Sequence, residues 1–250
     1  MGVFFKILII FVFSTTLFAK ETIVIFAAAH NKFVLPEIID RFTKKHPDTI
    51  FNIEYGASGK LRDSILEGVG YDIFLSADMN KPQEVYMAKK SATEVKKYSE
   101  GSLILVAPAD KSLKNRGLEI LKDSKIKKIA IANPKSAPYG KATIEVLKKI
   151  GIFEEISGKI IYTSDISTVI ANMAWYDEAG FTAKSAIKSL PLGYNKEGVH
   201  YIEIDSSLHS PIEHGFVVSN DGIKREVVKN FVDFLSSNEA LQIFREYGYK

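Results

Sequence analysis

The chain of 250 residues contains no cysteine. Without thiols it can form no disulfide bond, no cysteine-based metal site, no thiol nucleophile and no lipid-anchored cysteine. A strong excess of one charge is also missing, because 33 basic and 30 acidic residues give a formal net charge of +3. The lysines are spread along the whole chain, so a nucleic-acid-binding surface is not expected.

Sequence signatures of catalysis are missing as well. The phosphate-binding pattern GxxxxGK[ST] does not occur, and the nearest segment, GASGK at 56–60, lacks its spacing. There is no HExxH zinc motif and no G-x-S-x-G nucleophile elbow. His209 and His214 flank a loop without an acidic cluster, so no metal site is expected there. We therefore expect neither an enzyme nor a cofactor.

The N-terminus has the pattern of a signal peptide. Lys6 precedes a short apolar run at 7–13, and Ala19 is the expected last residue before cleavage. The apolar run is too short to span a bilayer comfortably, although an N-terminal membrane anchor stays open as an alternative. No second apolar run of spanning length follows. We expect 1–19 to be removed and the protein to be periplasmic.

Strand-like and helix-like segments alternate after residue 20, which predicts βαβ units and mainly parallel sheets flanked by helices. Nine strands are more economically packed as two α/β lobes than as one layer. The expected strands are 22–27, 51–56, 71–77, 102–108, 128–134, 159–163, 179–183, 199–204 and 214–219. The expected helices are 34–46, 58–68, 140–151, 166–176 and two within the last 28 residues.

Four strand-to-helix junctions share small or hydroxyl side chains. They are FAAAHNKF (26–33), EYGASGKLRD (54–63), ANPKSAPYGKATIEVL (132–147) and YTSDISTVIANM (162–173). Free backbone N–H groups at a helix start bind anions without a charged side chain. Any one junction is compatible with an ordinary loop, but four of them predict that two lobes close around one small oxyanion.

The order of these segments resembles the periplasmic molybdate-binding proteins of ABC importers over essentially the whole chain after the signal peptide. The runs DIFLSAD (72–78) and FLSSNEALQIFREYG (234–248) are the most typical of that family. The resemblance implies a two-lobed type II periplasmic binding protein fold, with two crossover strands joining the lobes. Lobe I would hold 20–100 plus 209–250, and lobe II would hold 101–208.

The resemblance also implies a function. It is that of a monomeric receptor that captures a tetrahedral oxyanion, molybdate or tungstate, and delivers it to an inner-membrane ABC permease. The family holds its ligand through serine hydroxyls, backbone N–H groups and one tyrosine hydroxyl. Here the two serine positions hold His30 and Ser58, and the tyrosine position holds Ala183. The implied ligand-binding residues are Ala29, His30, Ser58, Tyr139, Ile166 and Ala183.

Two of the three side-chain donors are therefore absent, which leaves the ligand open. Each lost hydrogen bond to a charged ligand costs about 1.5–3 kcal/mol. A protonated His30 would compensate, in which case affinity should fall as the pH rises from about 6 to about 8. An inward-turned Tyr139 hydroxyl is a second possible compensation. Alternatively, the ligand is another oxyanion, an organic anion filling the space at Ala183, or a metal ion bound through His30.

Two further readings stay open. His30 could cap its helix at the edge of the cleft and touch no ligand. The same two-lobed scaffold also carries enzyme and sensor domains, and a fold alone does not exclude them.

Overall fold

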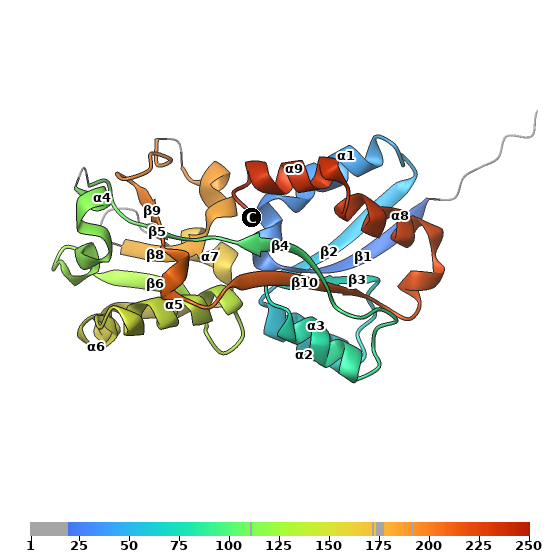
Figure 1. Cartoon of the computed structure of the whole chain (residues 1–250), viewed down its shortest axis with the longest axis horizontal. Helices are drawn as coiled ribbons and strands as arrows, with labels where there is room; N and C mark the ends of the chain where they lie inside the picture. Colours follow the sequence, from blue (N-terminus) through green and yellow to red (C-terminus); the bar gives the residue numbers. More distant parts are fainter. Residues whose placement is uncertain (1–19, 111, 172, 174–177, 192) are drawn as a thin grey trace, which may run out of the picture.

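The computed structural model describes residues 20–110, 112–171, 173, 178–191 and 193–250. Two lobes lie side by side along the long axis, and each is built on a five-stranded sheet flanked by helices (Figure 1). The expected signal peptide at 1–19 lies outside the described residues. Within the described ranges, no helix has the length and apolar character needed to cross a bilayer.

The first sheet has the strand order β2-β1-β3-β10-β4. Helices α1, α8 and α9 lie on one side of it, and α2 and α3 lie on the other (Figure 1). The strands are β1 (Glu21–Ala28), β2 (Thr49–Gly56), β3 (Ile73–Leu75), β4 (Lys96–Gly101) and β10 (Ile212–Val218). The helices are α1 (Leu35–Thr43), α2 (Ser58–Leu66), α3 (Asn80–Met87), α8 (Glu226–Leu235) and α9 (Asn238–Glu246).

Local sequence explains these elements. In β1, Ile23 and Ile25 face one hydrophobic cluster and Phe26 faces another, as the two-residue period of a strand requires. In α1, Leu35, Ile38 and Phe42 are buried on one face at helical spacing.

The second sheet has the order β7-β6-β8-β5-β9. Its strands are β5 (Leu103–Val106), β6 (Lys128–Ala132), β7 (Ile160–Thr163), β8 (Glu178–Ala183) and β9 (Tyr201–Glu203). Its helices are α4 (Leu113–Arg116), α5 (Pro138–Lys149), α6 (Phe153–Ile156) and α7 (Ile166–Ala171). Short 3-10 turns are η1 (Ala29–Phe33), η2 (Gly117–Lys122), η3 (Ser157–Lys159), η4 (Lys184–Ser189), η5 (Ser206–Leu208) and η6 (Gly222–Lys224).

The two-lobed α/β fold with two crossover connections is confirmed, with a difference in strand direction. Each sheet has two parallel and two antiparallel pairings rather than mainly parallel ones. The antiparallel strands belong to the crossovers. The chain leaves the first sheet through β4, enters the second through β5 after one residue, and returns from β9 to β10.

Strand β4 was not among the expected strands, because its sequence KKYSEG has little apolar character. It is nevertheless half-buried, with Tyr98 and Ser99 facing inward, because β10 pairs with it along its length. The first expected helix begins one residue late, since Ala29–Phe33 forms a 3-10 turn before it.

A close approach at Gly140 fixes the start of α5. A Cβ atom added there would overlap the carbonyl oxygen of Ala132 at the end of β6. Both partners are backbone, so no side chain can move to relieve the overlap. The glycine thus lets α5 begin directly beside the strand end, which places Tyr139 between the lobes.

We expect Gly140→Ala to destabilise the protein by about 1–3 kcal/mol, the usual cost of overpacking. Gly158→Ala is the matched control, because a Cβ at Gly158 has no atom within 4 Å. Urea unfolding of both variants measures the difference. Equal stability of the two variants would show that α5 is not fixed by this contact.

Candidate functional site

The four predicted junctions meet in one small cavity between the lobes. It is lined by residues 28–30, 56–58, 77, 137–139 and 166, and its space for a water-sized molecule is about 10 Å³. Five of the six predicted positions line it, namely Ala29, His30, Ser58, Tyr139 and Ile166. Ala183 is buried on β8, paired with Leu103, and is not among the lining residues.

Parallel strand registers bring the junctions together. In the first lobe Ala28 pairs with Gly56, and in the second Ala132 pairs with Thr163. Because parallel strands end at the same edge of a sheet, the loops that follow them converge.

Helices α2 and α5 both begin at the cavity with an alanine as N-cap. Ala57 and Ala137 have no side-chain oxygen, and neither helix has a side-chain cap. Serine, threonine, asparagine or aspartate normally fills this position and accepts from the first-turn N–H groups. In α2 the Gly59 N–H is already used by the Ser136 carbonyl, and Pro138 at the start of α5 has no N–H, so an acceptor from elsewhere could meet only the remaining first-turn N–H groups.

Ser58 is a buried hydroxyl with its donor hydrogen available. Its Oγ accepts a hydrogen bond of 2.9 Å from the backbone N–H of Ala77. A hydroxyl oxygen can accept and donate at once, so the O–H of Ser58 can still donate to a ligand. This contact also fixes the rotamer of Ser58 against the end of β3.

Hydrogen bonds across the cleft show that the two lobes are closed. The N–H of Gly59 on α2 donates to the carbonyl of Ser136 at 3.0 Å. The Ser185 hydroxyl on η4 of the second lobe donates to the His30 carbonyl at 3.4 Å, and the Tyr249 hydroxyl of the first lobe donates to the same carbonyl at 3.2 Å. A Cβ at Gly59 would lie 3.1 Å from Ser136 atoms, so the approach there is tight.

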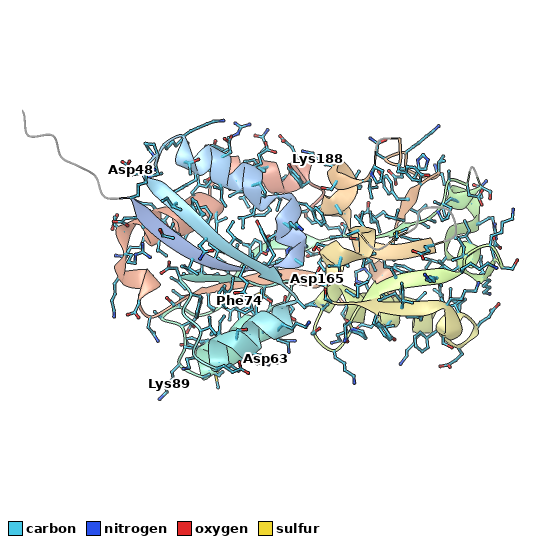
Figure 2. All side chains as sticks on the ribbon, turned by 180° about the vertical axis from the view of Figure 1, so that it is seen from behind. Asp48, Asp63, Phe74, Lys89, Asp165 and Lys188 are labelled. Carbon is cyan, nitrogen blue, oxygen red and sulfur yellow. The ribbon has the colours of Figure 1, made fainter. Side chains whose placement is uncertain are left out.

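Asp165 lies where the two lobes meet (Figure 2). One of its carboxylate oxygens accepts from the N–H groups of Ser167 and Thr168 at 2.9 and 3.0 Å. The carboxylate thus satisfies the first turn of α7 by itself. Ile166, the first residue of that turn, lines the cavity.

His30 is fully buried, and its surroundings favour the neutral ring. Its ring stacks on His214 with centroids 4.1 Å apart, and its Nε2 lies 3.2 Å from the Tyr98 hydroxyl. Desolvation by burial lowers the pKa of His30 to about 3. Burial, with His30 as a neighbour, also holds the pKa of His214 well below its usual value. The structure therefore opposes a cationic His30 at neutral pH.

The Tyr139 hydroxyl contacts His214, so it does not provide the compensating hydrogen bond to a ligand that the sequence left open. It lies 3.2 Å from Nε2 of His214, whose Nδ1 in turn lies 2.8 Å from the Ser99 hydroxyl. Gly101 gives these groups room, because a Cβ there would overlap the Tyr139 hydroxyl. Tyr139 can therefore offer its backbone to the cavity while its side chain joins the two crossover strands.

The buried polar cluster behind the cavity, formed by Tyr98, Ser99, Tyr139 and His214, was not predicted from the sequence. His214 was weighed only as a metal ligand beside His209, and Tyr98 lay in a strand that was not expected. Across the described residues no group of three histidine or acidic side chains is placed to hold a metal ion. No local sequence pattern points to this cluster, because Tyr98 and His214 are brought together only by the pairing of β4 with β10.

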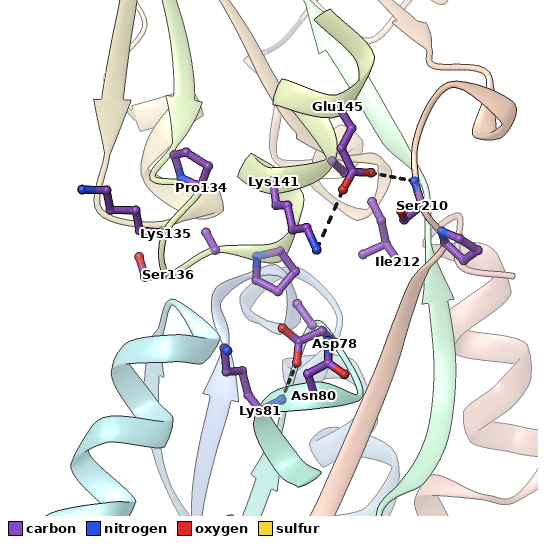
Figure 3. Close-up of a pocket in the computed structure, with 15 residues that line it drawn as sticks. Asp78, Asn80, Lys81, Pro134, Lys135, Ser136, Lys141, Glu145, Ser210 and Ile212 are labelled. Atoms are coloured by element: carbon purple, nitrogen blue, oxygen red, sulfur yellow. Dashed lines mark hydrogen bonds and ion pairs between the residues drawn. The ribbon is translucent and has the colours of Figure 1, made fainter. Parts of the chain in front are cut away.

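A wider groove adjoins the cavity and shares Ala77, Ala137 and Pro138 with it. Figure 3 shows charged side chains from both lobes around this groove. Glu145 contacts Lys141 and accepts from the Ser210 N–H at 2.8 Å. The lysines that line the groove are Lys81, Lys135 and Lys141.

The two buried histidines predict how stability depends on pH. Unfolding returns each ring to an ordinary pKa of about 6.5, so below that pH the unfolded state binds protons that the folded state excludes. We expect the free energy of unfolding to fall by up to about 1.4 kcal/mol per pH unit for each histidine as the pH drops from about 6 towards 4. Above pH 7 neither ring should contribute a slope.

Urea unfolding at pH 8, 7, 6, 5 and 4.5 measures this profile. The variant His30→Asn should be less pH-dependent than the wild type below pH 6, by about one proton. An identical slope in the two proteins would contradict a neutral, buried His30.

Comparison with known proteins agrees with this architecture. Residues 23–250 match the family described as bacterial extracellular solute-binding protein. The molybdate-binding protein ModA of Rhodobacter capsulatus is 33% identical over 232 residues, covering 90% of this chain and 87% of that protein. ModA of Azotobacter vinelandii is 28% identical over 231 residues, covering 89% and 87%.

A solved structure shares the fold. The periplasmic molybdate-binding protein of Azotobacter vinelandii superposes with a TM-score of 0.80 at 22% identity, covering 91% of this chain and 98% of that one. Together with the family match over nearly the whole described chain, these findings settle the class of protein. The chain belongs to the bacterial extracellular solute-binding proteins, which are receptors for transport rather than enzymes.

Proposed function

We propose that this protein is the periplasmic receptor of an ABC importer and that it binds a small tetrahedral oxyanion, with molybdate or tungstate as the cargo. The observation that carries the proposal is the pair of alanine-capped helices, α2 and α5, which begin at one closed cavity beside the Ser58 hydroxyl. The relatives named as molybdate-binding support the choice of cargo. The receptor acts as a monomer and delivers its ligand to an inner-membrane permease.

The lining of the cavity suits an inorganic anion held by neutral hydrogen bonds. No lysine or arginine is among the lining residues, which are small or apolar except for His30, Ser58 and Tyr139. The space open to a water-sized molecule in this closed form is only about 10 Å³, far below the range of about 300–1,000 Å³ typical of pockets for drug-sized ligands. An organic anion with a large substituent therefore fits less well than a compact one.

In this proposal, the lysines of the adjoining groove attract the anion but do not hold it. Lys81, Lys135 and Lys141 stand near the cleft but do not line the cavity. Positive charge beside a cleft raises the local concentration of anions and the rate of their association. Asp78 and Glu145 line the same groove and Lys141 pairs with Glu145, so capture would use the small net positive charge that is left, while retention uses hydrogen bonds.

A thermal-shift series on the purified protein without its signal peptide tests the function. Molybdate and tungstate at 100 times the dissociation constant should each stabilise the folded state by about 2.7 kcal/mol. Sulfate, phosphate, ferric iron and divalent metal ions are the comparison ligands. Stabilisation by metal ions with no response to any oxyanion would contradict the proposal.

Ser58→Ala should lower the affinity for molybdate about 10- to 150-fold, because a hydrogen bond to a charged ligand contributes about 1.5–3 kcal/mol. Ser237→Ala is the matched control. Ser237 also begins a helix, and its hydroxyl accepts from the Ala240 N–H at 3.2 Å, far from the cavity. It should cost stability, about 1 kcal/mol, and leave the affinity unchanged.

Isothermal titration calorimetry measures both affinities. Equal affinities of the Ser58 and Ser237 variants would remove Ser58 from the ligand set.

A further inference from the structure

One ring nitrogen of His30 has no partner. The side chain is 0% exposed, and His30 lines the cavity. Its Nε2 lies 3.2 Å from the Tyr98 hydroxyl, whereas its Nδ1 is buried with no hydrogen-bond partner among the described residues. A buried polar atom without a partner costs free energy, so it marks a place where a ligand can supply the missing bond.

The state of Nδ1 depends on where Tyr98 directs its single hydroxyl hydrogen. Three acceptors lie within reach of that hydroxyl: the Ser76 carbonyl at 3.3 Å, the Asn31 side-chain oxygen at 3.3 Å and Nε2 of His30. The Asn31 amide also donates to the hydroxyl at 3.0 Å. A neutral imidazole carries one hydrogen, so the choice made by Tyr98 fixes which nitrogen of His30 is the donor.

While Nδ1 has no partner, donation from Tyr98 to the Ser76 carbonyl is the arrangement that avoids an orphaned N–H on His30. If the hydroxyl donates to Ser76, then Nε2–H of His30 donates to Tyr98, and the unpartnered Nδ1 is only a bare acceptor. The opposite arrangement would bury an unpaired N–H at Nδ1. Orphaned buried N–H groups are rarer in proteins than under-satisfied acceptors.

We propose that His30 is a specificity-determining residue that changes tautomer when an oxyanion binds, so that Nδ1–H donates to the ligand while Nε2 accepts from Tyr98. The proposal rests on the proposed function and names how the site recognises a fully ionised oxyanion. Such a ligand has only acceptors on its surface, and a bare Nδ1 would repel it. Tyr98 is the positioning residue, since its hydroxyl turns from Ser76 to His30.

The change conserves charge. One proton leaves Nε2, one proton joins Nδ1 of the same ring through exchange with water, and no net proton is taken up. The titratable groups around the ring are His214 of β10, Tyr98 of β4, Tyr139 of α5 and Tyr249 at the C-terminus. None of these supplies a carboxylate that would stabilise an imidazolium. Affinity should therefore be flat between pH 6 and 8.

Nitrogen NMR of protein labelled in its histidine rings reads the tautomer directly, with His30→Asn used to assign the signal. Before molybdate is added, His30 should carry its hydrogen on Nε2, and in the complex on Nδ1. A ring that keeps Nε2–H, that is already Nδ1–H without ligand, or that becomes doubly protonated would overturn the proposal.

A double-mutant cycle separates positioning from general stability. Tyr98→Phe should lower molybdate affinity about tenfold in the wild type but less than about twofold in the His30→Ser background, where no imidazole needs orienting. An equal loss in both backgrounds would show that Tyr98 acts only on the fold. Melting temperatures of the ligand-free variants confirm that each is folded.

Failure of this inference is distinguishable from failure of the proposed function. If molybdate raises the melting temperature but leaves the His30 tautomer unchanged, the proposed receptor function is supported and the proposed tautomer change of His30 is wrong. If no oxyanion changes the melting temperature, the proposed function itself is wrong.

Discussion

Closing two lobes over a small cavity buries backbone polar groups at four loop junctions, and each of these groups then needs a partner. This constraint explains several of the hydrogen bonds around the cleft. Gly59 and Ser136 satisfy each other, and the His30 carbonyl receives hydroxyls from Ser185 and Tyr249. Among the buried side-chain atoms of the described residues that have no hydrogen-bond partner, Nδ1 of His30 belongs to a residue that lines the cavity, and Oγ of Ser136 belongs to one that lines the adjoining groove.

The crossover strands do more than connect the lobes. Tyr98 and Ser99 of β4 and His214 of β10 form the floor behind the cavity, and they contact both His30 from the first lobe and Tyr139 from the second. A movement of either lobe about these strands would have to rearrange the same polar side chains. Ligand contact and lobe orientation are thus linked through one buried cluster.

The sequence predicted the junctions well because their signal is local. Small residues after a strand and before an amphipathic helix indicate a bare strand end, and five of the six predicted positions line one cavity. Strand β4 and the antiparallel pairings were not predictable in this way. KKYSEG forms a strand only because β10, more than a hundred residues later, pairs with it. The buried cluster depends on that long-range pairing, so no local pattern around Tyr98 predicts its contact with His30.

Under the proposed function, an alanine at position 183 would mean that the site keeps its chemistry while changing its donors. Ala183 is buried and paired on β8, away from the cavity lining. Tyrosine hydroxyls reach the neighbourhood of the ligand instead from β4 and the C-terminus, where Tyr98 and Tyr249 hold the ring and the carbonyl of His30. An imidazole anchored in this way can present a single directed hydrogen bond, as a serine hydroxyl does, without bringing charge into the cavity. Because burial lowers the pKa of His30, a neutral ring that donates a single N–H is the form in which we propose that it takes a serine's place.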